Sequence, residues 1–429
     1  MASVLDSPVR CSAGRAWRTL ESNQTTPGAQ ASQVPGAGPQ GSGEYRLPSL
    51  TTEQVAGGRW PLVDLRSPGE FAEDHLPGAY SHPLFDDTER ALVGTVYNKA
   101  SPDEAYARGL EITARKVSAL TDGIALDMGF EVDSAEVLAC MRRIAGDGKQ
   151  ALEGRLCIEP TDGATLPQGA FVLHCWRGGL RSQSVCALLR ELGQPAYLLE
   201  GGYKAYRRSV LNALGQLQFP RAYVLRGLTG VGKTLVLREI ERLAPGATID
   251  LEDLAQHRSS ILGAAGLEPV SQRAFESRLL ERHRQGYPHD FVFYEGESRK
   301  IGNAIQPELV WESLKQGVDL RLSATLARRV EVLSEDYLER SNSRDFLEQQ
   351  LPFLEQRLGT DKFRGVLVGH LRENRISELV ELLLERYYDP LYKHSEPDHR
   401  VAREFNADDP TRCAEELLAF VNKSQLPVG

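Results

Sequence analysis

The sequence has 429 residues, a length that allows two or three domains and excludes a single small module. Apolar residues make up 41% and charged residues 25%, which are values of an ordinary globular protein and exclude global disorder. The net charge of -9 argues against a polyanionic partner, but residues 171–240 hold ten basic and three acidic residues, a local net charge of +7.

Membrane insertion, secretion and disulfide chemistry are also disfavoured. No stretch approaches the roughly 18 apolar residues of a spanning helix, and the first residues lack the apolar core of a signal peptide. We therefore predict a cytoplasmic protein without a membrane partner. The six cysteines are scattered without a C-x-x-C pair, so any cysteine chemistry is expected from a single thiol.

The composition changes along the chain and predicts four regions. Residues 1–44 are rich in Gly, Pro, Ser, Ala and Gln, have almost no apolar periodicity, and are expected to form a flexible extension. A first α/β domain is predicted over 45–216 and a second over 217–330. Beyond Leu326 only helical patterns remain, so a helical region is predicted over 331–429.

Apolar runs and helical periodicity alternate in both α/β domains. Strands are predicted at 60–65, 170–174, 196–199, 222–225, 247–251, 291–294 and 319–322. Helical patterns cover 86–120, 134–144, 181–192 and 232–243. This alternation predicts parallel sheets, whose ligands bind beyond the carboxyl ends of the strands.

The first chemical motif is HCWRGGLRS, residues 174–182, which joins a predicted strand to a predicted helix. A loop in this position lies at the positive end of the helix dipole and stabilises an anion or a thiolate. We predict that Cys175 is a catalytic nucleophile and that Arg181 binds a tetrahedral oxyanion. Gly178 and Gly179 are expected to bind phosphate through a backbone with positive φ. The alternative is that Cys175 is a small buried apolar residue.

Residues 60–206 resemble a rhodanese domain. VDLRSPGEFAEDHLPGAYSHP is similar to the opening motifs of that family, and LEGGYKAYR is similar to its closing turn. The resemblance implies a cysteine that carries a sulfur atom as a persulfide. Five residues separate Cys175 from Arg181, one more than is common in sulfur-transferring rhodaneses, and His-Cys-x5-Arg is also the signature of cysteine phosphatases. The wider loop favours a substrate with a phosphate-like group.

The second chemical motif is GLTGVGKT, residues 227–234, which satisfies the phosphate-loop pattern between a predicted strand and a predicted helix. Its predicted phosphate-binding residues are Gly227, Gly230, Gly232, Lys233 and Thr234. Mg²⁺ is expected at Thr234 and Glu295. The competing acidic residues are Glu297, Asp250, Glu252 and Asp253. The loop selects phosphates rather than a base, so any diphosphate, a prenyl diphosphate included, could bind.

The order of the two motifs resembles one family, the tRNA 2-selenouridine synthases. The similar segments are PLFDDTERALVGTVYNKASPDEAYARG, CWRGGLRS, LEGGYKAYR, GLTGVGKT, DLEDLAQHRSS, YEGESRKIGNAIQP and YYDPLYKHS. One departure is HRSSILG, in which a glycine is expected within the pair Ser259 and Ser260. The resemblance implies a rhodanese-like parallel-sheet domain, then a P-loop parallel-sheet domain and a helical C-terminal region.

The same resemblance implies a transferase that replaces sulfur by selenium in a wobble 2-thiouridine of tRNA. The reaction would pass through an S-geranylated base and use geranyl diphosphate and selenophosphate, so the enzyme would combine selenotransferase with geranyltransferase activity. We expect the diphosphate at Lys233, and selenophosphate at Cys175, which would receive or guide selenium.

Basic residues in and near the charged window are candidates for substrate and tRNA contacts. They are Arg177, Arg207, Arg208, Arg299 and Lys300, and their alternative role is ordinary helix surface. Two other functions stay open. One is a P-loop kinase or ATPase with a rhodanese sensor domain, and the other is a rhodanese-fold cysteine phosphatase.

Overall fold

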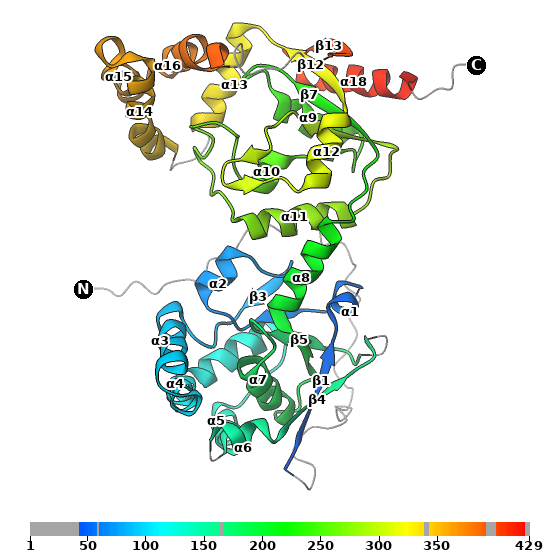
Figure 1. Ribbon diagram of the computed structural model, residues 1–429, viewed down its shortest axis with the longest axis vertical. Helices are drawn as coiled ribbons and strands as arrows, with labels where there is room; N and C mark the ends of the chain where they lie inside the picture. Colours follow the sequence, from blue (N-terminus) through cyan, green and yellow to red (C-terminus); the bar gives the residue numbers. More distant parts are fainter. Residues whose placement is uncertain are drawn as a thin grey trace. The chain divides into compact units, whose positions relative to one another are not determined.

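The computed structural model describes residues 43–57, 60–146, 148–163, 166–338, 343–391 and 400–424. Nearly all of the predicted flexible extension, residues 1–42, lies outside these described residues. The chain divides into two compact units between Arg207 and Arg208 (Figure 1). This division lies within a helix that the sequence assigned to the first domain, whose predicted end was residue 216.

The first unit contains a six-stranded, entirely parallel sheet with the order β3-β2-β5-β6-β1-β4. Its strands are β1 (Tyr45–Leu50), β2 (Leu62–Asp64), β3 (Ala79–Ser81), β4 (Leu156–Pro160), β5 (Phe171–His174) and β6 (Ala196–Leu199). Its helices are α1 (Thr52–Gly57), α2 (Pro68–Glu73), α3 (Asp87–Lys99), α4 (Pro102–Met128), α5 (Ser134–Ala145), α6 (Lys149–Glu153) and α7 (Leu180–Glu191). Helix α8 (Gly202–Leu214) leads into the second unit.

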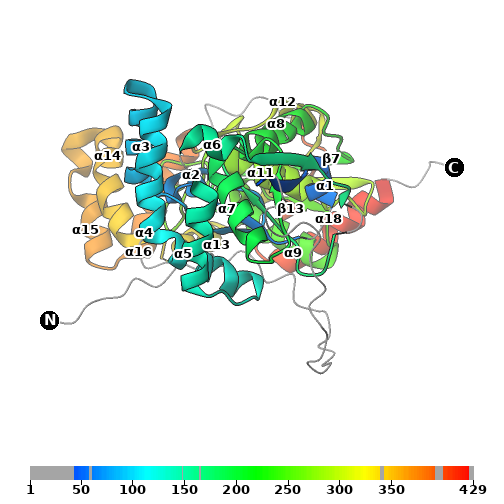
Figure 2. The same ribbon diagram turned by 90° about the horizontal axis from the view of Figure 1, so that it is seen from below.

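The helical pattern predicted over 86–120 forms two helices rather than one. The chain breaks at Ser101, whose side chain accepts a hydrogen bond from the Glu104 amide, and Pro102 occupies the first turn of α4. Proline fits there because the first amides of a helix have no intrahelical partner. Helices α3 and α4 consequently lie side by side, as both views of the molecule show (Figures 1 and 2).

The second unit contains a five-stranded parallel sheet with the order β13-β12-β7-β9-β8. Its strands are β7 (Arg221–Arg226), β8 (Thr248–Ile249), β9 (Phe291–Glu295), β12 (Val318–Ser323) and β13 (Arg403–Asn406), and β10 (Lys300–Ile301) pairs with β11 (Ala304–Ile305) in a separate hairpin. Its helices are α9 (Lys233–Leu243), α10 (Leu251–Ala255), α11 (Gln272–Arg284), α12 (Glu308–Gln316), α13 (Leu326–Leu338), α14 (Ser343–Phe363), α15 (Val366–Arg372), α16 (Ile376–Leu383), the π-helical segment η2 (Leu384–Tyr388) and α18 (Pro410–Ser424). The two parallel α/β units confirm the predicted fold class.

The prediction of a purely helical region beyond Leu326 is wrong. Strand β13 pairs in parallel with β12, and helix α18 packs against α9. Cys413 and Leu417 of α18 are completely buried in the same apolar core as Val236 of α9. The C-terminal segment therefore completes the second sheet domain instead of forming a separate region.

Helices α13 to α16 share a second apolar core in this unit. Leu351, Leu367 and Val380 are completely buried in it, together with Leu262 from the loop after α10. None of the helices in the described ranges is both long enough and apolar enough to cross a membrane.

Candidate functional site

Cys175 follows the carboxyl end of β5, a strand with neighbours on both sides, and precedes α7. The thiol is only 2% exposed, and its Sγ lies 3.2 Å from Oγ of Ser182 in the first turn of α7. The amino end of a helix concentrates unpaired amide groups and positive dipole charge. The structure thus puts the predicted nucleophile at a position that favours an anion.

The backbone of the cysteine loop is held by the turn after β6. The amide of Tyr203 donates to the Cys175 carbonyl over 2.9 Å. A Cβ atom at Gly202, which has φ +59°, would lie 2.4 Å from that same carbonyl, so no side chain fits there. Gly178 has the expected positive φ of +68°. Gly179, the residue immediately before α7, does not have the expected positive φ, because its φ is -88°.

A buried polar network lies at the ends of the strands that flank this loop. Arg66 donates to the Asp64 carboxylate over 2.6 Å, and its guanidinium lies 3.9 Å from the centre of the Tyr203 ring. His174 is completely buried, and neither of its ring nitrogens has a hydrogen-bond partner among the described residues. Burial lowers the pKa of His174, so the ring is neutral near pH 7.

Arg181 contacts an acidic residue that the sequence did not single out. Its Nη1 lies 3.4 Å from Oε2 of Glu70, and Nε of Arg90 lies 3.2 Å from the same oxygen. Both arginines line a pocket of about 940 Å³ that also includes Cys175 and the exposed Arg177. In the sequence, only the EF pair of the rhodanese-like opening pointed to Glu70. Its pairing with Arg181 depends on the fold and could not be predicted.

The phosphate loop connects β7 to α9, as predicted. Gly227, Gly230 and Gly232 have φ values of +153°, +81° and +84°. A Cβ atom at Gly227 would lie 2.6 Å from the Leu322 carbonyl, which shows why this position requires glycine. Lys233 begins α9, and its Nζ donates to the Gly227 carbonyl over 3.3 Å. The lysine therefore reaches back over the loop that would hold phosphate groups.

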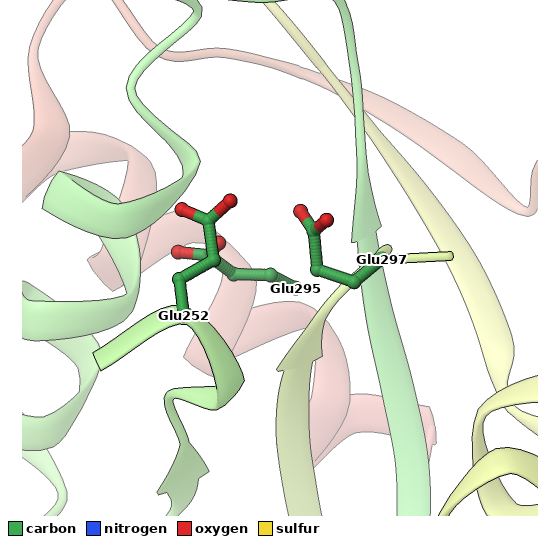
Figure 3. Close-up of side chains that lie close together, drawn as sticks. All are labelled: Glu252, Glu295 and Glu297. Atoms are coloured by element: carbon green, nitrogen blue, oxygen red, sulfur yellow. The ribbon is translucent and has the colours of Figure 1, made fainter. Parts of the chain in front are cut away.

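Three carboxylates meet beside this loop (Figure 3). Glu252 comes from α10, Glu295 ends β9, and Glu297 follows it, with one oxygen of each lying within 4.8 Å of the others. Glu295 is completely buried, and neither of its carboxylate oxygens has a hydrogen-bond partner within the described part of the chain. A buried carboxylate without such a partner, close to two further carboxylates, fits a bound cation, and Mg²⁺ prefers such oxygen ligands.

Burial and neighbouring negative charges shift the pKa values of the carboxylates in this cluster. Burial, followed by the negative charges of Asp250 and Glu297, raises the pKa of Glu295 to about 8. Burial also raises the pKa of Glu252, and it raises that of Asp250 to about 6. Thr234 and Glu295 are the Mg²⁺ ligands predicted from the sequence, and Thr234 lines the pocket that contains all three glutamates. Glu252 and Glu297 therefore join this pair as candidate Mg²⁺ ligands.

The pocket around the phosphate loop has a volume of about 810 Å³ and a mixed lining. Its charged lining residues include Arg238, Arg258 and Lys315. Its apolar and aromatic lining residues include Ile261, Leu267, Val332, Leu333, Tyr337 and Leu391. The sequence motif HRSS contained Arg258, and the basic window 171–240 contained Arg238, but no signal connected Lys315 to the site.

The remaining basic candidates lie outside both pockets. Arg207 and Arg208 lie on α8, and neither lines the cysteine pocket or the phosphate-loop pocket. Arg299 forms an ion pair with Glu308, and Lys300 is exposed in the β10–β11 hairpin. Of the five basic candidates, only Arg177 is brought to a pocket.

The comparisons with known proteins identify relatives over most of the chain. A family model described as the tRNA 2-selenouridine synthase AAA domain matches residues 220–423. The tRNA 2-selenouridine synthase of Marinobacter nauticus is 29% identical over 365 residues, which cover 78% of this chain and 88% of that protein. The one of Nitrosomonas europaea is 28% identical over 390 residues, 80% and 90% of the two chains.

The solved N-terminal domain of a candidate ATP/GTP binding protein from Clostridium difficile 630 is 30% identical and covers 38% of this chain and 98% of its own. Its TM-score of 0.27 is too low to support an argument about the fold. The tRNA 2-selenouridine synthase of Salmonella agona is 30% identical over 363 residues, 78% of this chain and 88% of that protein. Its similarity runs through most of both chains, and the phosphate-loop unit matches the family model, so this chain belongs to the tRNA 2-selenouridine synthase family.

Proposed function

We propose that this protein replaces the sulfur of a wobble 2-thiouridine in tRNA by selenium, with geranyl diphosphate and selenophosphate as co-substrates. The observation that supports the proposal is the presence of two different candidate anion sites in one chain of this family. One holds a thiol at the start of α7, and the other holds a lysine and three carboxylates at the phosphate loop. Each site suits one of the two phosphate-bearing co-substrates.

Geranylation is assigned to the phosphate loop. The sulfur of 2-thiouridine attacks C1 of geranyl diphosphate, the bond from C1 to oxygen breaks, diphosphate leaves, and the base loses its N3 proton. The loop amides and Lys233 bind the departing diphosphate, whose negative charge they stabilise. Glu252, Glu295 and Glu297, together with Thr234, would hold Mg²⁺, which neutralises diphosphate charge when bound.

Selenation is assigned to the cysteine loop. Selenium of selenophosphate attacks C2 of the S-geranylated base, and geranylthiol leaves with the proton from selenium. Water then cleaves the bond between phosphorus and selenium, which yields phosphate and returns a proton to N3. These reaction steps need no oxidant or reductant, so selenium does not have to be bound covalently to Cys175, and Cys175 guides it to C2. The amino end of α7, together with Arg181, binds the phosphate group.

The basic window supports binding of the tRNA backbone. Residues 171–240 carry a net charge of +7 in a chain of net charge -9, and Arg177 and Arg208 are exposed within it. Phosphate contacts made by such residues release counterions, so tRNA binding should weaken steeply as salt is raised.

Mass analysis of tRNA nucleosides tests the proposal. Wild-type protein should form S-geranyl-2-thiouridine with geranyl diphosphate alone and 2-selenouridine when selenophosphate is also present. Lys233→Ala should slow geranylation about 100-fold or more, because a donor to the developing diphosphate charge is lost. Cys175→Ser should geranylate normally but install no selenium. Lys423→Ala and Cys157→Ser, both at exposed positions, are the matched controls and should behave as wild type.

The opposite results identify the competing functions. Full geranylation by Lys233→Ala would remove the phosphate-loop assignment, and selenium incorporation at wild-type speed by Cys175→Ser would remove the cysteine assignment. Turnover of labelled ATP without tRNA would favour a kinase or ATPase. Release of phosphate from aryl phosphates would favour a cysteine phosphatase.

A further inference from the structure

The pocket beside Cys175 is far more apolar than a small oxyanion needs. Of its volume of about 940 Å³, selenophosphate would contact only the region near the loop. Much of the remaining wall is hydrocarbon. Its apolar lining includes Phe85, Val93, Leu110, Met141, Leu180 and Leu188. Pockets of this size and character usually enclose an organic group rather than an inorganic ion.

Helix α3 forms part of this wall but contributes no buried residue to the core. None of its residues is buried, although Val93 and Tyr97 line the pocket and Tyr97 is 55% exposed. Its neighbour α4 does belong to the core, since Ile112 and Ile124 are buried there. An apolar ligand in the pocket would remove the exposed side chains of α3 from water, which provides a driving force for binding.

Basic residues occur among the apolar lining of the same pocket. Arg90, Arg177 and Arg181 line it together with Cys175. This combination matches a ligand with an apolar chain at one end and a polyanion at the other. A prenylated RNA base has that composition, because its chain is hydrocarbon and its flanking backbone is phosphate.

We propose that this pocket binds the geranyl chain of the S-geranylated base during selenation. The inference rests on the proposed function, which supplies the S-geranylated base as the substrate of the cysteine site. The chain joins the base through the thioether sulfur, so a chain held among Val93, Leu110 and Leu188 keeps the adjacent C2 near Cys175. The pocket thereby admits the alkylated base in preference to 2-thiouridine and sets the order of the two stages.

Equilibrium binding of synthetic RNA tests this inference without catalysis. Fluorescence anisotropy would compare anticodon stem–loops that carry 2-thiouridine, S-methyl-2-thiouridine or S-geranyl-2-thiouridine, with full-length protein and no selenophosphate. Each buried methylene can strengthen binding about fourfold. Partial burial of the chain should therefore make the S-geranyl RNA bind at least about 30-fold tighter than the S-methyl RNA.

Two sets of substitutions locate the chain. Leu110→Asp and, separately, Val93→Asp with Tyr97→Ser should reduce the preference to about threefold or less, since a charge or a polar group then faces the chain. Leu126→Asp changes a leucine of the same helix α4 that is 83% exposed and lies outside the pocket lining, and it should keep the full preference. Unchanged affinity for the 2-thiouridine RNA shows that each variant is folded.

The outcomes separate this inference from the proposed function. It is overturned if wild-type protein shows no preference for the geranyl chain, or if both pocket variants keep it. It is also overturned if Leu391→Asp, a change of an apolar residue that lines the phosphate-loop pocket, abolishes the preference instead. A failure of the S-geranyl RNA to yield 2-selenouridine with selenophosphate would refute the proposed function, while the chain preference would still be measured independently.

Discussion

Ser259 combines two unfavourable features at the edge of the phosphate-loop pocket. Its φ of +44° lies in the left-handed region, which side chains with a Cβ atom adopt at a cost of about 1–2 kcal/mol. Its hydroxyl is buried and has no hydrogen-bond partner in the residues that the structure describes. This is the serine pair in which the family resemblance leads one to expect glycine, and the backbone conformation gives the physical reason for that expectation.

We predict that Ser259→Gly stabilises the protein by about 1 kcal/mol, because relief of the left-handed strain and of the buried hydroxyl outweighs the added entropy of the unfolded chain. Urea denaturation would measure the change in the free energy of unfolding. The matched control is Ser260→Gly. Ser260 does not have a positive φ, so this substitution should destabilise the protein by about 0.5–1 kcal/mol. Equal or lower stability of Ser259→Gly would contradict the interpretation.

At the scale of elements, the carboxylate cluster depends on the neighbouring strands β8 and β9. These strands pair in parallel, so the start of α10 after β8 and the end of β9 reach the same edge of the sheet. Glu252 and Glu295 meet there although they are distant in the sequence. The element arrangement, rather than any local pattern, concentrates the negative charge.

This arrangement predicts a stability that depends on pH and Mg²⁺. The pKa of Glu295 is about 8 in the folded protein, against an ordinary value of 4.5, so the folded state holds a proton that the unfolded chain releases. The free energy of unfolding should therefore fall as pH rises through this range, by up to about 1.4 kcal/mol per pH unit for one such group. Mg²⁺ requires the ionised carboxylates and should offset the loss.

Thermal unfolding at pH 6 and pH 8.5, with and without Mg²⁺, measures both effects. Mg²⁺ should raise the Tm by several degrees at pH 8.5 and by little at pH 6, because protons compete for the same oxygens. Glu295→Gln should flatten the pH dependence and weaken the response to Mg²⁺, whereas the exposed Glu378→Gln should change neither. The same Mg²⁺ response at both pH values would argue against a cation at this cluster.

The elements also show which parts of the fold the sequence can predict. Strands β7 and β9 were predictable because AYVL and FVFY are continuous apolar runs that become buried. Strand β13 was missed because it is an edge strand of sequence REFN, in which only Phe405 is buried. The two loops were predictable because their residues are consecutive. The contact of Arg181 with Glu70 was not predictable, because it joins residues from two different elements.

At the scale of the whole molecule, the two proposed reaction sites lie on different units. Cys175 belongs to the first unit, and Lys233 to the second. A base that is geranylated at one and selenated at the other must reach both sites. Transfer can occur within one chain, or the S-geranylated tRNA can leave and bind another copy. The proposed chain pocket favours the second route, because it would let any copy with an intact first unit capture the released intermediate.

A mixture of two inactive variants distinguishes these routes. Cys175→Ser keeps the phosphate-loop unit, and Lys233→Ala keeps the cysteine loop, so neither alone should convert 2-thiouridine to 2-selenouridine. Together, with both co-substrates, they should form 2-selenouridine after a lag in which S-geranyl-2-thiouridine accumulates, as nucleoside mass analysis would record. Mixing either variant with the double variant should give no selenium product. If the mixture of the two single variants also gives none, although each binds tRNA as wild type does, the intermediate must be handed over within one chain.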